Sequence, residues 1–362
     1  MEIKRVVRVG IVGCGGIAWG KHMPSLAEVE NVQMVGFCDL EEGKAKSASE
    51  KYGAEGAKYY TDYKELLKDE SIEVVHVLTP NSSHSEISVA ALEAGKHVMC
   101  EKPMAISYVD GLKMVEAAKR TGKKLTIGYQ NRFRVDTLLL HEICENDELG
   151  EVYFAKAHAI RRRAVPTWGV FLKAKEQGGG PLIDIGTHAL DLTLWFMKNY
   201  KPKYVVGNSY RKLAEQENQG NEWGKWDTKE FTVEDSAFGF VTMENGATVV
   251  IEASWALNTL QTGEAMTTLC GTKGGADMAD GLRINRIDHD SRMTLMPTPP
   301  GKEVDFFGKK KDNPALTEAI SWINAIVNDT EPVVKPEEAL AVTQILEAIY
   351  ESSKTGKPVY FN

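Results

Sequence analysis

The chain has 362 residues, a formal net charge of -8 and a pI of about 5.6, so it lacks the positive field that attracts phosphate backbones or anionic lipids. We therefore expect neither nucleic acid nor membrane as a partner, and the longest apolar runs fall well short of the roughly 20 residues that span a bilayer. The length favours two domains. Five cysteines stand singly, without a Cys-x-x-Cys pair, and no signal peptide precedes the first strand-like pattern, which predicts a cytoplasmic location.

Short β-branched runs alternate with amphipathic helical stretches over the first third of the chain. This alternation is typical of a parallel sheet covered by helices. We therefore predict an α/β fold that begins with a doubly wound Rossmann domain over residues 1–128. The expected strands are 6–12, 32–38, 74–78, 98–100 and 124–128, and the expected helices include 85–94 and 108–120.

Longer alternating stretches follow residue 128, after a helix expected at 137–146. The Asn245-Gly246 pair favours a tight hairpin, so at least two of these strands should be antiparallel. We predict a second α/β domain over residues 129–362, with a large, mainly antiparallel open sheet. The expected strands are 152–163, 204–210, 232–243, 247–255 and 264–269, with a loop at 215–229 and helices at 314–328 and 336–353.

A glycine-rich turn joins the first strand to the first helix, and its residues are Gly13, Gly15, Gly16, Ile17 and Ala18. In this Gly-x-Gly-x-x-Ala pattern, Gly13 permits a tight turn, Gly15 lets the backbone approach a pyrophosphate, and Ala18 allows close packing of helix on strand. The start of the helix then offers amide donors to the anion. The pattern alone also fits an ordinary strand-to-helix turn.

Asp39 supports the dinucleotide interpretation, because it follows the second strand where an acid can bind the adenosine ribose. Its carboxylate would repel the 2′-phosphate of NADP, and Leu40 offers no compensating charge, so we expect NAD. Lys44 and Lys46 lie nearby and leave NADP open. The alternative role for Asp39 is that of an acid at the start of a loop.

Two more motifs follow strands at the edge of the predicted sheet where ligands bind in open α/β folds. Their residues are Thr79, Pro80, Asn81 and His84 after the strand 74–78, and Glu101 and Lys102 after the strand 98–100. The first motif also fits a capped helix start. We expect the Lys102 ammonium to polarise a substrate oxygen, the alternative being a solvated lysine.

Three glycines at 178–180 are typical of a flexible loop, here entering a buried helix on which Asp184 and His188 share one face. Oxidising a secondary alcohol requires loss of the hydroxyl proton as hydride leaves carbon, and histidine, with a pKa of about 6.5, suits that step. We interpret His188 as the general acid/base, Asp184 as the group that orients it or binds a neighbouring hydroxyl, and Lys102 as the cation that stabilises the alkoxide. A metal site that includes Asp191 lacks an obvious third ligand, and a core histidine satisfied by Asp184 is the other alternative.

In this order and spacing, these motifs resemble those of the glucose-fructose oxidoreductase / inositol dehydrogenase / MocA (Gfo/Idh/MocA) family over essentially the whole chain. Lys102, Asp184 and His188 could run the reaction without a metal, and the resemblance implies that they form the catalytic set. It also implies that NAD is lined by Glu101, Lys102 and the segment 79–84, and that Gln130, just past the last Rossmann strand, faces cofactor and substrate. The resemblance also implies that the domain over residues 129–362 binds substrate and forms homodimers or homotetramers through its open sheet.

Two further features concern the substrate. Arg161 and Arg163 should share one strand face, where they would bind a phosphate or carboxylate or else form salt bridges. Trp168 would stack on the apolar face of a sugar or on the nicotinamide, or else anchor a loop. We count Arg163 and Trp168 with the catalytic set as substrate-binding residues.

We predict an NAD-dependent oxidoreductase that moves a hydride between the nicotinamide and a secondary alcohol or ketone of a sugar, sugar derivative or inositol. One alternative is a glycosidase or epimerase with tightly held, internally recycled NAD. The second alternative is a non-enzymatic sensor of NAD or sugar, against which the intact proton-transfer groups argue.

Overall fold

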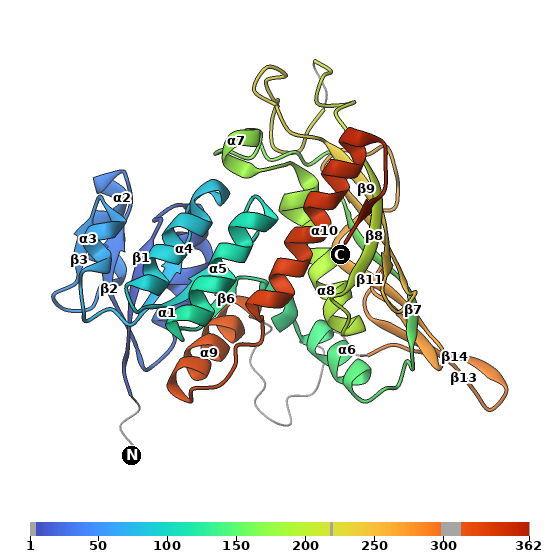
Figure 1. Cartoon of the computed structure of the whole chain (residues 1–362), viewed down its shortest axis with the longest axis horizontal. Helices are drawn as coiled ribbons and strands as arrows, with labels where there is room; N and C mark the ends of the chain where they lie inside the picture. The colour runs from blue at the N-terminus through green and yellow to red at the C-terminus, as the bar shows by residue number, and fades with distance from the viewer. Residues whose placement is uncertain (1–4, 218–219, 298–312, 362) are drawn as a thin grey trace. The chain divides into compact units, whose positions relative to one another are not determined.

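The computed structural model describes residues 5–217, 220–297 and 313–361. The chain divides into two compact units. The first unit comprises Met1–Gln130 and Asn313–Leu340, and the second comprises Asn131–Asp312 and Ala341–Asn362. Figure 1 shows the helices and strands of both. The segment 313–340 thus packs with the first unit, whereas the sequence pattern had suggested one continuous domain after residue 128.

The first unit is built on a six-stranded parallel sheet in the order β3-β2-β1-β4-β5-β6. Its strands are β1 (Val7–Val12), β2 (Val32–Cys38), β3 (Lys58–Tyr60), β4 (Val74–Val77), β5 (His97–Cys100) and β6 (Leu125–Ile127). Its helices are α1 (Met23–Ala27), α2 (Glu42–Tyr52), α3 (Tyr63–Leu67), α4 (His84–Glu93), α5 (Tyr108–Thr121) and α9 (Pro314–Val327). The doubly wound prediction is confirmed, and the five expected strands end within one residue of their predicted bounds.

The inner strands are buried because helices cover both faces of a parallel sheet. All four residues of β4 are buried, for example. The edge strand β3 was not predicted, since its three residues lack buried apolar positions that alternate with polar ones.

Helix α9 belongs to the first unit because its apolar side joins the core of that unit. Asn313 caps the helix by accepting a hydrogen bond from the Leu316 amide at 3.2 Å, and Pro314 stands in its first turn. Trp322 and Ile323 are buried in the same cluster as Val9 of β1. A sequence-local pattern predicts such a helix but cannot say which core it joins.

The second unit contains a nine-stranded sheet in the order β14-β13-β12-β11-β7-β10-β9-β8-β15. Its strands are β7 (Val152–Ile160), β8 (Pro202–Tyr210), β9 (Ser236–Met243), β10 (Thr248–Ser254), β11 (Gly263–Gly271), β12 (Gly274–Asp277), β13 (Arg283–Asp288), β14 (Ser291–Leu295) and β15 (Val359–Tyr360). Its helices are α6 (Val135–Glu145), α7 (Ala174–Gln177), α8 (Thr187–Met197) and most of α10 (Pro336–Thr355).

This sheet is mainly antiparallel, as predicted, and β7 and β10 form its parallel pair. The Asn-Gly hairpin is confirmed, because β9 and β10 pair antiparallel around Gly246, whose φ is 89°. Strands β12 to β15 were not predicted.

One face of the nine-stranded sheet is covered by α8 and the later part of α10 (Figure 1). Ala155, Ala157 and Ala159 of β7 are buried, and a side chain at Gly239 would collide with Ile349 of α10. On the opposite face, Val206 and Phe240 are 39% and 44% exposed. Across the described residues, helices that combine the length and the apolar character needed to cross a bilayer are absent.

Candidate active site

The glycine-rich turn has the shape that a pyrophosphate requires. Gly13 has a φ of +95°, and a Cβ there would lie 2.6 Å from the carbonyl oxygen of Leu78, so a larger residue does not fit. A Cβ at Gly15 or Gly16 would meet no atom within 4 Å, so space lies open beside the backbone where the helix begins. These residues therefore fit a dinucleotide. Ala18 is buried and Ile17 is 42% exposed.

Asp39 lies beside this turn at the end of β2. One carboxylate oxygen accepts a hydrogen bond from the Cys14 amide at 2.9 Å, and the other accepts one from the Glu41 amide at 2.9 Å. Lys44 forms an ion pair with Glu41 at 2.6 Å, so this neighbour is already partnered.

We expect NAD to bind at least tenfold more tightly than NADP, because a 2′-phosphate would meet the Asp39 carboxylate and tenfold corresponds to about 1.4 kcal/mol. Titration of both nucleotides by intrinsic fluorescence measures the ratio. In Asp39→Ser the ratio should move toward unity, whereas the exposed Glu55→Gln serves as the control. Tighter binding of NADP by the wild type would contradict this assignment.

His84 connects two segments of the first unit that the sequence had placed beside the cofactor. The side chain is fully buried, and its ring nitrogens lie 2.8 Å from the carbonyl oxygens of Thr79 and Pro103. Burial lowers the pKa of His84. The imidazole therefore supports the backbone at both strand ends. Asn81 is also buried, whereas Thr79 is half-buried and Pro80 exposed.

Glu101 is held from three sides inside the first unit. Lys21 donates a hydrogen bond to its carboxylate at 2.7 Å, His22 Nε2 lies 2.7 Å from the same oxygen, and the Lys102 amide donates to the other oxygen at 3.1 Å. Lys21 also pairs with Glu318 of α9 at 2.9 Å. Burial by itself would raise the pKa of Glu101. Lys21 and His22 have the larger combined effect and keep that pKa well below its usual range.

This buried cluster fixes the strand end that carries Lys102, whose side chain is half-buried. Glu101 thus holds this strand end through its hydrogen bonds and its charge. Gln130, also half-buried, starts a short 3-10 turn just after β6. Lys21, His22 and Glu318 were missed by the sequence analysis, because a lysine on one helix and a glutamate on a distant one carry no local signal of their pairing.

The glycine run 178–180 is packed tightly, which corrects the expectation of a flexible loop. Gly179 and Gly180 are buried, and a Cβ at Gly180 would lie 2.2 Å from the Glu234 carbonyl oxygen. The Glu234 carboxylate accepts hydrogen bonds from the Gly180 amide at 2.8 Å, the Leu182 amide at 3.1 Å and the Tyr350 hydroxyl at 2.8 Å. The glycines are needed for close approach, and Glu234 anchors the start of the helical segment that follows.

Burial raises the pKa of Glu234 from 4.5 to about 7, against the opposing effect of its three donors. Because the native state then holds a proton that the unfolded chain loses near pH 4.5, this stabilising contribution is complete below pH 4.5 and is lost as the pH rises to about 7. At 1.36 kcal/mol per pH unit, the loss is about 3 kcal/mol.

We therefore expect the difference in unfolding free energy between wild type and Glu234→Gln to fall by about 2–3 kcal/mol between pH 5 and pH 8. Urea titrations at both pH values measure it. The same comparison with Glu230→Gln, at an exposed neighbouring position, should show no such fall. If the difference in unfolding free energy between wild type and Glu234→Gln stays constant, the Glu234 carboxyl does not titrate in this range.

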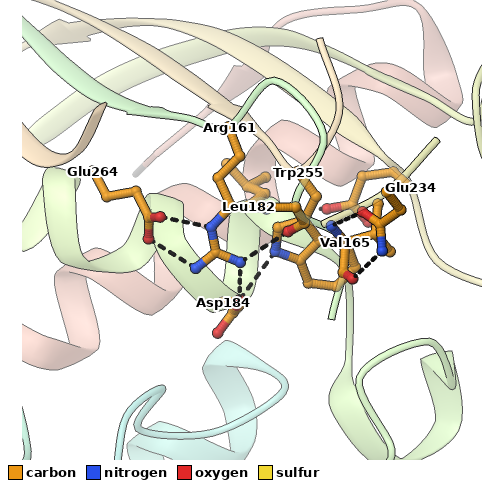
Figure 2. A network of polar contacts seen from close by, with 9 residues as sticks. Arg161, Val165, Leu182, Asp184, Glu234, Trp255 and Glu264 are labelled. Atoms are coloured by element: carbon orange, nitrogen blue, oxygen red, sulfur yellow. Dashed lines mark hydrogen bonds and ion pairs between the residues drawn. The ribbon is translucent and has the colours of Figure 1, made fainter. Parts of the chain in front are cut away.

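Asp184 lies on a π-helical segment, Leu182–Gly186, that leads directly into α8. Its side chain is 8% exposed. Its Oδ2 atom accepts a hydrogen bond from Trp255 Nε1 at 3.0 Å and lies 4.0 Å from Nη1 of Arg161 (Figure 2). π-Helical turns occur often at functional sites. His188, in the first turn of α8, is half-buried.

Asp191 is engaged elsewhere and does not extend this pair into a metal site. Its carboxylate accepts hydrogen bonds from Nε and Nη2 of Arg132 at 2.9 and 2.6 Å, with both side chains buried. In the part of the chain that the structure describes, no group of three or more histidine, cysteine or carboxylate side chains is arranged to hold a metal ion.

The arginines that follow β7 do not share one strand face, because β7 ends at Ile160 and the three arginines lie beyond it. Arg163 donates to Asn258 Oδ1 at 2.7 Å. Arg161 donates two hydrogen bonds to Glu264, at 2.6 and 2.8 Å. Sequence reasoning missed Trp255, Glu234 and Glu264, since each contacts its partner only through the folded sheet.

Trp168 is 52% exposed and contacts Trp223 edge-to-face, with ring centroids 5.0 Å apart. Trp223 lies in the loop expected at 215–229, and its ring stacks over the Arg161 guanidinium at 5.0 Å. Exposed indole rings beside Arg161 and Asp184 offer an apolar surface of the kind that sugar rings stack on.

Comparison with known proteins agrees with this architecture. Residues 7–129 match the family described as "Oxidoreductase family, NAD-binding Rossmann fold", and residues 137–277 match the GFO/IDH/MocA C-terminal domain. D-glucoside 3-dehydrogenase of Escherichia coli (strain K12) is 35% identical over 98% of this chain and 97% of that protein. Glucose-6-phosphate 3-dehydrogenase of Bacillus subtilis (strain 168) is 26% identical over 97% of this chain and 98% of that protein.

The structure of aldose-aldose oxidoreductase from Caulobacter crescentus, complexed with glycerol, shares 25% sequence identity and a TM-score of 0.79, covering 99% of this chain and 100% of that one. The matches span both parts of the fold and nearly the whole chain. The chain therefore belongs to the Gfo/Idh/MocA family of oxidoreductases and is an NAD-binding enzyme of the sugar and inositol dehydrogenase type.

Proposed function

We propose that this enzyme oxidises the secondary hydroxyl at ring position 3 of a glucose-type sugar, with NAD as hydride acceptor. Two of the relatives that match along nearly their whole length are named for dehydrogenation at position 3. The structural observation that carries the proposal is the pair Asp184 and His188 on one helical segment, with Asp184 buried and hydrogen-bonded to Trp255.

Each residue has a distinct role in the proposed reaction. His188 removes the hydroxyl proton as the alcohol becomes a ketone, and the half-buried Lys102 ammonium stabilises negative charge on that oxygen. Asp184 orients the imidazole or accepts a hydrogen bond from a neighbouring sugar hydroxyl. Bound NAD supplies the hydride acceptor. The residues proposed to hold it are Gly13, Gly15, Gly16, Ile17, Ala18, Asp39, Thr79, Pro80, Asn81, Lys102 and Gln130, with His84 and Glu101 supporting them from behind.

The test is reduction of NAD, followed at 340 nm, with methyl β-D-glucoside, D-glucose, myo-inositol and D-glucose 6-phosphate. We expect NADH to accumulate with a glucose-type sugar, and nuclear magnetic resonance of the product to show a carbonyl at position 3. Turnover of the sugar without NADH, together with nucleotide released on denaturation, would favour internally recycled NAD. Binding without turnover would favour a sensor.

Assembly into homodimers or homotetramers through the C-terminal sheet remains a prediction. The open face of the nine-stranded sheet supports it, because Val206 and Phe240 expose apolar side chains there on adjacent strands. A cytoplasmic location likewise stays a prediction from the scattered cysteines.

A further inference from the structure

The proposed function leaves open whether the sugar is neutral or carries a phosphate or carboxylate. Arg161 is the natural candidate for binding such an anion, since its Nη1 atom lies 4.0 Å from Asp184 and its side chain is 16% exposed. An arginine binds a phosphate or carboxylate most strongly when its guanidinium can donate two parallel hydrogen bonds. Arg161 could bind an anion in this way only if two of its N–H donors were available.

Glu264 already occupies these donors. Its two carboxylate oxygens accept from Nε and Nη2 of Arg161, and Nη1 donates to the Ala164 carbonyl oxygen at 3.2 Å. The Trp223 ring stacks on the guanidinium. Figure 2 shows Arg161 between Glu264 on one side and Asp184 on the other. Within the described residues, each side of the Arg161 guanidinium thus already contacts a protein group.

The charges around Arg161 point the same way. Asp184 and Glu264 carry two negative charges against one positive charge, and Glu222 adds a further negative charge within electrostatic range of Arg161. A phosphate or carboxylate placed here would meet net repulsion. Hydroxyl groups can instead donate hydrogen bonds to these carboxylates, and the exposed Trp168 offers an apolar surface for the C–H face of a sugar ring.

We propose that the substrate is an uncharged sugar or glycoside, and that Glu264 determines this specificity by engaging Arg161. This inference rests on the proposed function. It assigns Glu264, on β11, a role in substrate selection that is separate from the reaction at His188.

The experiment compares kcat/KM for methyl β-D-glucoside, D-glucose 6-phosphate and D-glucuronate in the wild type and in Glu264→Gln. We expect the wild type to prefer the neutral glucoside at least tenfold over either anion. Glu264→Gln should raise the ratio of anionic to neutral activity at least tenfold, because it removes one negative charge and frees Arg161 donors. Glu148→Gln is the matched control, since Glu148 pairs with Arg286 on the same sheet, and it should leave the ratio unchanged.

A wild type that prefers either anion would overturn the proposal, as would an unchanged ratio in Glu264→Gln. The wild-type comparison needs no variant, so the test does not depend on how the substitution folds. If none of the three compounds yields NADH, the proposed function fails. The inference is then decided by binding of the same compounds, followed through tryptophan fluorescence, where tighter binding of an anion would refute it.

Discussion

Replacing His188 with alanine is expected to lower turnover by roughly 10²–10⁴-fold, the usual contribution of a general acid/base, while NAD affinity stays near that of the wild type. The imidazole would accept the hydroxyl proton, so its loss removes proton transfer. The residues proposed to hold the dinucleotide, by contrast, lie in the first unit of the chain. Steady-state NADH formation gives turnover, and equilibrium titration gives the dissociation constant for NAD.

The control for this experiment is His289→Ala, at a side chain that is 93% exposed, and it should leave both quantities unchanged. The pH profile separates a chemical role from a structural one. If His188 is the base, wild-type activity should fall at acidic pH, where the imidazole is protonated. The residual activity of His188→Ala should lack this acidic fall and keep the alkaline limb that the wild type shows. Turnover of His188→Ala equal to that of the wild type would remove His188 from the mechanism.

Replacing Arg132 with methionine is expected to destabilise the protein by about 3–5 kcal/mol, because Asp191 would be left as a buried, unpaired carboxylate. The ion pair has two hydrogen bonds, its side chains are 0% and 1% exposed, and the guanidinium also stacks over Trp195 at 5.1 Å. Urea denaturation of wild type and variant measures the loss.

Two further variants make the result interpretable. The double variant Arg132→Met, Asp191→Leu should recover much of the lost stability, since neither charge then remains buried. Arg134→Met is the matched control, because Arg134 pairs with Asp136 at side chains that are 25% and 26% exposed, and it should cost about 1 kcal/mol or less. Equal losses of stability in Arg132→Met and Arg134→Met would contradict the expected cost of leaving the buried Asp191 carboxylate unpaired.

Local patterns in the sequence were sufficient for the elements whose identity depends on neighbouring residues. The glycine-rich turn, the acid at Asp39 and the Asn245-Gly246 hairpin are set by backbone conformations that only certain residues adopt. Alternating β-branched and helical stretches predicted the parallel sheet and most strands of the second sheet. The order and spacing of the motifs were also sufficient for the family.

Several features of the site were decided only by tertiary structure. Arg161 looked from the sequence like a candidate anion ligand, and its pairing with Glu264, 103 positions away, reverses that interpretation. The glycine run 178–180 was predicted to be flexible, but Glu234, 54 positions from Gly180, accepts a hydrogen bond from the Gly180 amide and holds the run in place.

Asp191 shares the helix of His188, yet the fold pairs it with Arg132. The segment 313–340 likewise joins the first unit only through the packing of α9. The physical reason is common to these cases. A turn or an amphipathic helix is determined by residues within a few positions of one another, whereas an ion pair depends on which distant side chains the sheet brings within about 3 Å. The sequence by itself therefore determined the fold, the cofactor class and the family of this protein, and the tertiary structure decided which of its charged groups pair with one another.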